Sequence, residues 1–127
     1  MLQTGDLVSH FTVTNLNGDR FAYSDIWQRK NLVLVSLPHA ESAASAKYVA
    51  QIVAQMSELT SDDTVCVITR DGVSGVTSPG VVIADQWGEI HHVCCGTRID
   101  DLPSPYDLVE WLRYVRNQCP ECQGEAQ

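Results

Sequence analysis

The chain of 127 residues has few basic side chains and no long apolar run. Eight lysines and arginines stand against sixteen aspartates and glutamates, which gives a formal net charge of −8. Nucleic acids and anionic membrane surfaces bind clustered basic residues, so neither is expected as a partner. No window reaches the roughly 18 apolar residues that a membrane-spanning helix needs.

The N-terminal residues lack the basic segment followed by an apolar stretch that marks a secretory signal. We therefore expect a soluble protein of the cytoplasm, where thiols stay reduced. An odd number of cysteines cannot all pair with one another, so catalysis, metal binding or burial come before structural disulfides. The five cysteines are Cys66, Cys94, Cys95, Cys119 and Cys122.

The first half of the chain predicts a β-hairpin followed by a strand, a helix and a strand. Residues 11–23 alternate around an Asn-Gly pair, which favours a tight turn because both residues tolerate positive φ. Residues 32–37 and 64–69 are apolar runs typical of strands covered on both faces. A helix over about 41–59 joins them through a right-handed crossover. Its predicted buried stripe is Val49, Ile52, Val53, Met56 and Leu59.

The second half of the chain predicts two antiparallel strands and a closing helix. Residues 81–84 and 89–95 lie on either side of a short turn, and Ser104 suits the cap of the helix that follows. Together these elements predict an α/β fold with a mixed sheet of about five strands and flanking helices. We expect one domain over 1–118 and a short tail over 119–127.

These elements, in this order, resemble the thioredoxin-like superfamily, and within it the AhpC/TSA-type redoxins related to peroxiredoxins. The resemblance covers about residues 5–118. It depends on LVLVSLP before the long helix, on Ser78-Pro79 ahead of VVIADQWGEI, and on LVEWLRYV in the last helix. It implies a thioredoxin-like fold and a thiol–disulfide oxidoreductase or antioxidant role, with no cofactor.

The resemblance also implies a place for a reactive cysteine, and this chain has no cysteine there. In redoxins the cysteine opens the helix after the strand that matches 32–37, where the helix N-terminus stabilises a thiolate. The matching place is at about residues 40–45, which include Glu41 and Ser42, and His39 comes directly before it. A serine activated by histidine, or an anion pocket, is one interpretation. We favour an ordinary helix start, with an acidic first turn and a serine cap.

Pro79 matches the proline that thioredoxin-like proteins hold in cis beside the active helix. In that role it would present free backbone to an extended peptide. A proline that simply begins the next strand is an equal alternative.

The strongest local motif is CPEC, which contains Cys119 and Cys122. This spacing suits a dithiol/disulfide couple, so the two cysteines are our candidate catalytic residues. It also suits half of a tetrahedral zinc or iron site, completed by His91, His92 or the tail of a second subunit. Because adjacent strand residues point to opposite faces, at most one of the two histidines is expected at any one site. An exposed tail with incidental thiols is the third interpretation.

The other cysteines are expected to lie apart from this tail. Cys94 and Cys95 end their strand at the end of the sheet where the reactive cysteine would stand, and the closing helix should carry Cys119 to the opposite end. Alternation along a strand predicts that Cys94 and Cys95 are two separately buried thiols. Cys66, inside an apolar run, is predicted to lie in the core.

Two functions follow from these observations. The first is a redoxin-type oxidoreductase whose thiol chemistry has moved to the CPEC tail, with Cys94 or Cys95 as secondary thiols and an unknown protein partner or redox donor. The second is a non-catalytic thioredoxin-fold module that binds a protein partner through the vacated groove. A homodimer bridged by a metal ion between two tails is a variant of the second.

Overall fold

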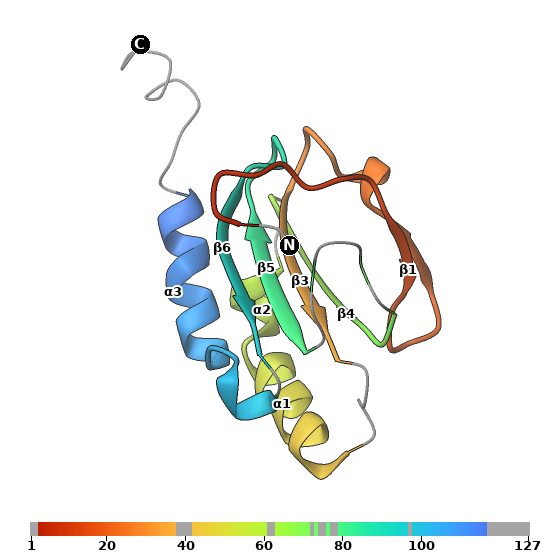
Figure 1. Cartoon of the computed structure of the whole chain (residues 1–127), viewed down its shortest axis with the longest axis vertical. Coiled ribbons are helices and arrows are strands. Elements are labelled where there is room, and N and C mark those ends of the chain that lie inside the picture. Colours follow the sequence, from red (N-terminus) through yellow and green to blue (C-terminus); the bar gives the residue numbers. More distant parts are fainter. Residues whose placement is uncertain are drawn as a thin grey trace.

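A four-stranded mixed sheet forms the centre of the molecule (Figure 1). The computed structural model describes residues 3–37, 42–60, 63–71, 73, 76, 79–96 and 98–116, with only the backbone of Cys95. The strands are β3 (Asn31–Ser36), β4 (Thr64–Thr69), β5 (Gly80–Ala84) and β6 (Ile90–Cys95), in the order β4-β3-β5-β6. β3 and β4 are parallel, and β5 is antiparallel to both β3 and β6. The predicted parallel and antiparallel pairs are both confirmed.

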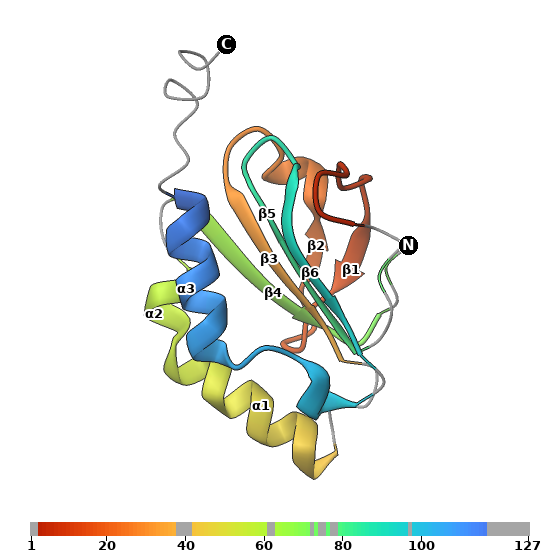
Figure 2. The same cartoon turned by 60° about the vertical axis from the view of Figure 1, so that its left-hand side comes forward.

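The helices all pack on one face of this sheet, as Figures 1 and 2 show. They are α1 (Ala43–Ala54), α2 (Met56–Leu59) and α3 (Pro105–Arg116). Their apolar side chains form one core with those of β3 and β5 that point the same way. The largest fully buried members of this core are Leu37, Ile52, Leu59, Ile83, Leu108 and Leu112.

The long helix expected over 41–59 is divided in two. Gln55 has φ −103° and ψ 10°, and it separates α1 from α2. Within α1, Tyr48 is 5% exposed while Val53, part of the predicted stripe, is 59% exposed. The stripe prediction is therefore wrong at Val53. The reason is that the buried face of α1 runs through Ser45, Tyr48 and Ile52, and Val53 lies beyond its edge.

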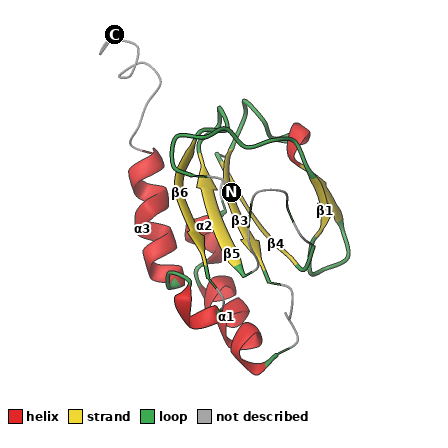
Figure 3. Cartoon of the chain, viewed as in Figure 1, coloured by secondary structure: helices red, strands yellow, loops and turns green. Residues whose placement is uncertain are grey.

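A β-hairpin covers the opposite face of the sheet (Figure 3). It consists of β1 (Thr12–Thr14) and β2 (Arg20–Ala22), and Gly18 in its turn has φ +89°, as an Asn-Gly turn requires. The 3₁₀ helix η1 (Tyr23–Asp25) follows. The predicted mixed sheet of about five strands is thus four strands plus a separate two-stranded sheet. Helices flank one face, and the hairpin covers the other.

α3 lies alongside β6 and connects the two ends of the sheet (Figure 2). It begins as predicted, because Ser104 Oγ accepts a hydrogen bond of 3.2 Å from the backbone N–H of Asp107. Near its last described residue, Arg116, the ring of Tyr114 contacts His91 at the beginning of β6. In the described part of the chain, no helix is long and apolar enough to cross a membrane.

Candidate functional site

The end of β3 is where the sequence places the altered redoxin site. Ser36 at this end pairs with Gly80, and Gly80 pairs with Cys95. The carbonyl of Pro79 accepts a hydrogen bond of 3.1 Å from the N–H of Gly96. Pro79 and the end of β6 therefore lie side by side. We call this region, with the start of α1, the Pro79 end of the sheet.

Ser42 caps α1 at the Pro79 end. Its backbone is extended, with φ −66° and ψ 155°, and its Oγ accepts a 3.2 Å hydrogen bond from the N–H of Ser45. This is the helix-cap role that the sequence favoured for Ser42. His39 and Glu41, the other members of the altered redoxin site, lie outside the described residues.

Tyr48 and Cys94 fasten the segment before α3 to the Pro79 end. The hydroxyl of Tyr48 donates a 2.6 Å hydrogen bond to the carbonyl of Pro103, and Cys94 Sγ lies 3.2 Å from the carbonyl oxygen of Asp101. Burial raises the pKa of Tyr48, and the nearby Cys94 and Cys66 thiols raise it further. These described polar groups therefore hold α1, β6 and the chain before α3 together.

Cys66 lies under the helices and packs against their core, as predicted. Burial raises the pKa of its thiol from 9.0 to about 12. A thiol with that pKa is almost entirely protonated at neutral pH, so it is a poor nucleophile. Cys119 and Cys122 lie outside the described residues, as does the side chain of Cys95.

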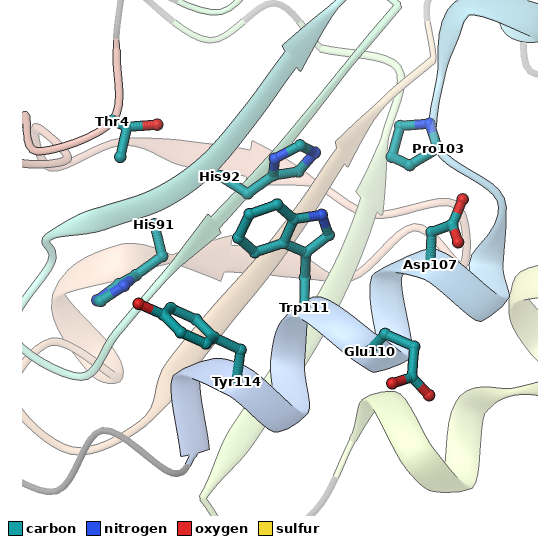
Figure 4. A pocket seen from close by; sticks show the side chains of 8 residues that line it. All are labelled: Thr4, His91, His92, Pro103, Asp107, Glu110, Trp111 and Tyr114. Atoms are coloured by element: carbon teal, nitrogen blue, oxygen red, sulfur yellow. The ribbon is translucent and has the colours of Figure 1, made fainter.

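A cavity of about 710 Å³ lies between β6 and α3 (Figure 4). Aromatic rings form much of its wall, because His92 stacks on Trp111 with 4.4 Å between ring centroids, and Tyr114 meets Trp111 edge-on. Burial lowers the pKa of His92, which keeps its imidazole neutral at pH 7. Its Nε2 is buried and has no hydrogen-bond partner among the described residues. The lining residues are Thr4, His91, His92, Pro103, Asp107, Glu110, Trp111 and Tyr114.

Both histidines of β6 line this one cavity, although alternation along a strand predicted that they would point to opposite faces. The register explains the difference, because Ile83 pairs with His92 whereas the next residue, Ala84, pairs with Ile90. His91 is thus the extra residue of a β-bulge, which re-aims its side chain. The expectation of one histidine per site is wrong for this reason.

The turn between β5 and β6 carries a cluster that the sequence analysis did not find. Asp85 Oδ1 accepts hydrogen bonds from the N–H groups of Trp87 and Glu89, at 2.9 and 3.0 Å. Its Oδ2 lies 2.9 Å from His91 Nε2, and Glu89 Oε2 lies 3.7 Å from the same nitrogen. The signal in the sequence is Asp85, Glu89 and His91 around a predicted tight turn. We call this region the turn end of the sheet.

The arrangement of sheet, hairpin and helices is that of the thioredoxin-like fold, and solved peroxiredoxins are among the structures similar to it. The reduced 2-Cys peroxiredoxin of Plasmodium vivax has a similar structure, with a TM-score of 0.71 and 7% sequence identity over 90% of this chain and 96% of that one. Peroxidoxin BcpB from Mycobacterium tuberculosis gives a TM-score of 0.62 and 15% identity, covering 91% of this chain and 99% of the other. A thiol:disulfide interchange protein of the thioredoxin family from Chlorobium tepidum gives 0.60 and 11%, covering 91% and 99%.

These likenesses confirm the thioredoxin-like fold that the sequence predicted. At such low identities they define the fold and not the activity. No protein-family model matches the chain, and no curated protein matches it. The chemistry must therefore be argued from its own residues.

Proposed function

We propose that this chain is a redoxin-type thiol–disulfide oxidoreductase that uses Cys119 and Cys122 in place of a cysteine at the start of α1. The observation that carries the proposal is the CPEC motif shortly after the last helix of a redoxin fold. In the reaction, the two thiols become one disulfide, and two electrons and two protons reduce a partner's disulfide to two thiols. Acting on oxidised thiols in a reducing compartment such as the cytoplasm, the couple would have an antioxidant role.

The cysteine positions support the tail over the usual place. No cysteine precedes Cys66 in the sequence, and Cys66 itself is held protonated by burial. α3 runs away from the Pro79 end, and its last turns lie beside His91 at the other end of the sheet (Figure 1). The proposal therefore puts the reactive thiols after α3 in the sequence and away from the Pro79 end.

Reduction of insulin disulfides, with a small dithiol such as dithiothreitol supplied to re-reduce the couple after each turnover, tests this proposal with the full chain. We expect turnover that falls at least about tenfold in Cys119→Ser and in Cys122→Ser, because each variant lacks half of the couple. Ser42→Ala is the matched control and should keep the wild-type rate. Turnover that persists when both tail cysteines are replaced would contradict the proposal.

Thiol alkylation followed by mass spectrometry gives a second measurement. With a raised pKa of about 12, Cys66 should remain unmodified in the folded protein at neutral pH, and it serves as an internal control. After mild oxidation, Cys119 and Cys122 should lose reactivity together as one disulfide. Independent modification of the two thiols would argue against a couple.

A second candidate is a non-catalytic thioredoxin-fold module that binds a protein partner. The observation that favours it is the use of Ser42 as a helix cap at the place where redoxins carry their nucleophile. This candidate predicts no disulfide reductase turnover in the wild-type chain. Its metal-bridged variant predicts a homodimer that dissociates when a chelator is added, which sedimentation analysis would detect.

A further inference from the structure

The turn end of the sheet places three metal-ligating side chains around one point. One ligand atom from each of Asp85, Glu89 and His91 lies within 4.8 Å of the other two. Ligand atoms around a zinc ion, with bonds of about 2.1 Å, are about 3 to 3.5 Å apart. The separations of 2.9 and 3.7 Å from His91 Nε2 match that spacing. We propose that these three residues bind a divalent first-row transition-metal ion of the zinc class.

The site is built before any ion arrives. Two backbone N–H groups hold Asp85 Oδ1, which leaves Oδ2 directed at His91. The β-bulge directs the side chain of His91 toward Asp85 in the turn. The side chains of His91 and Asp85 are only 11% and 13% exposed, so little conformational freedom is lost on binding. Outer hydrogen bonds that orient ligands in this way are typical of metal sites.

The local charge favours a cation. Within the described parts of the chain, neither Asp85 nor Glu89 has a lysine or arginine partner within 4.0 Å. Two carboxylates therefore face a single imidazole, in a chain whose net charge is −8. Binding through this nitrogen requires an unprotonated Nε2, with the ring N–H on Nδ1.

A second observation at the same turn points to a polar occupant. The hydroxyl of Tyr23 is buried and has no hydrogen-bond partner among the described residues. It lies directly under the turn, because a Cβ atom on Gly88 would come within 3.0 Å of it. Burial, with a further contribution from Asp85, raises its pKa to about 12. This buried hydroxyl is therefore open to a water molecule at the turn that carries Asp85 and Glu89.

The site has room for an additional ligand. His91 also lines the cavity of about 710 Å³ between β6 and α3 (Figure 4). Three protein ligands leave at least one coordination position unfilled, as in zinc sites that bind water or substrate and unlike closed structural sites. All three proposed ligands lie at the turn end of the sheet, so metal binding there needs no residue of the CPEC tail.

Cobalt titration followed by visible absorbance tests the site in the full chain. Cys119→Ser and Cys122→Ser are introduced first, so that tail thiolates contribute no ligands. We expect one equivalent of Co²⁺ to bind and Zn²⁺ to displace it. His91→Gln and Glu89→Gln should each weaken binding at least about tenfold. Glu58→Gln, which changes a half-exposed carboxylate on α2 away from the turn, is the matched control and should leave the affinity unchanged.

The outcomes separate this site from others. Unchanged affinity in His91→Gln and in Glu89→Gln would place the ion elsewhere and overturn the proposal, as would binding that requires the tail cysteines. Glu89 is about half exposed, so its variant decides the matter even if His91→Gln fails to fold. Mn²⁺ added to labelled protein should broaden the amide resonances of residues 85–91, and broadening confined to other regions would equally overturn it. In a chain that keeps Cys119 and Cys122, Glu89→Gln should reduce disulfides at the same rate as the unsubstituted protein.

Discussion

The two ends of the central sheet use their polar groups differently. At the Pro79 end, Ser42 Oγ, the Tyr48 hydroxyl and Cys94 Sγ each have an internal partner. At the turn end, the Tyr23 hydroxyl lacks one among the described residues, and so does His92 Nε2 in the neighbouring cavity. Burying a polar atom without a partner costs stability, so folded proteins rarely keep such atoms unless another role retains them.

The difference is that the described polar groups serve the fold at one end of the sheet and are open to a ligand at the other. Thioredoxin-like proteins are expected to act at the end where β3 leads into α1. In this chain that end is a structural junction, in which a serine cap and a tyrosine hydrogen bond hold the elements together. Among the residues that the structure describes, the groups available to a ligand lie at the turn end and along β6. Variants at the two ends can test this comparison.

The largest effect is expected for Gly88→Ala at the turn end. Gly88 has φ +86°, and an added Cβ would lie 3.0 Å from the Tyr23 hydroxyl. Backbone strain and this contact together should lower the free energy of unfolding by about 2 kcal/mol. Gly18→Ala is the control, since Gly18 has φ +89° but no atom within 4 Å of the added Cβ. It should lose only about 1 kcal/mol in urea denaturation, and equal losses would show that the turn is not closely packed on Tyr23.

Tyr48→Phe should give the next largest loss, at the Pro79 end. The substitution removes the hydroxyl that donates to the Pro103 carbonyl and leaves that carbonyl without its donor. We expect about 1.5 kcal/mol less stability by urea denaturation. Tyr106→Phe, at a side chain that is 64% exposed, should change nothing measurable. A neutral Tyr48→Phe would mean that the hydrogen bond does not fasten this end.

Ser42→Ala should lower stability by about 1 kcal/mol, because α1 loses the side chain that caps its N-terminus. Ser104→Ala, which removes the equivalent cap of α3, should cost about the same. The measurement is again urea denaturation, now with disulfide reduction measured in parallel. Full stability combined with lost turnover would identify Ser42 as a reactive group and reverse our view of the Pro79 end.

Most of the fold could be predicted from the sequence, because its local signals agree with one another. The Asn-Gly turn, the apolar runs of β3 and β4, and the serine cap of α3 each specify an element without help from distant residues. The division of the long helix at Gln55 could not be predicted, since neither glycine nor proline marks it. After the break, α2 packs against β4 and α3. Hydrophobic periodicity along the sequence does not reveal such contacts between distant segments.

The site was less predictable, because it depends on register. A bulge adds one residue to β6 without any change of composition, yet it brings His91 beside Asp85 and the α3 cavity. A prediction from strict alternation therefore put His91 and His92 on opposite faces, although both line the same cavity. The motif at Cys119 and Cys122 is visible in the sequence, but its spacing alone does not decide between a redox couple, a metal site and incidental thiols.

Tyr23→Phe should have the smallest effect, and its sign is informative. Tyr48→Phe removes a hydroxyl that has a partner, whereas Tyr23→Phe removes a buried hydroxyl that has none among the described residues. We therefore expect the free energy of unfolding to stay unchanged or to rise by up to about 1 kcal/mol. The pH dependence should change as well. Because burial raises the pKa of Tyr23 from 10.0 to about 12, wild-type stability falls as the pH rises above 10, where the unfolded chain ionises first.

Urea denaturation at pH 8 and at pH 11 measures both effects, and Tyr23→Phe should lose less stability than the wild type between the two. A loss at pH 8 as large as that of Tyr48→Phe would show that the Tyr23 hydroxyl has a partner in solution. Repeating the measurement with a chelator would then identify that partner. If the loss disappears on chelation, a metal ion or its bound water bonds to Tyr23, and if it persists, water alone does. In either case the turn end would no longer differ from the Pro79 end in leaving this group unsatisfied.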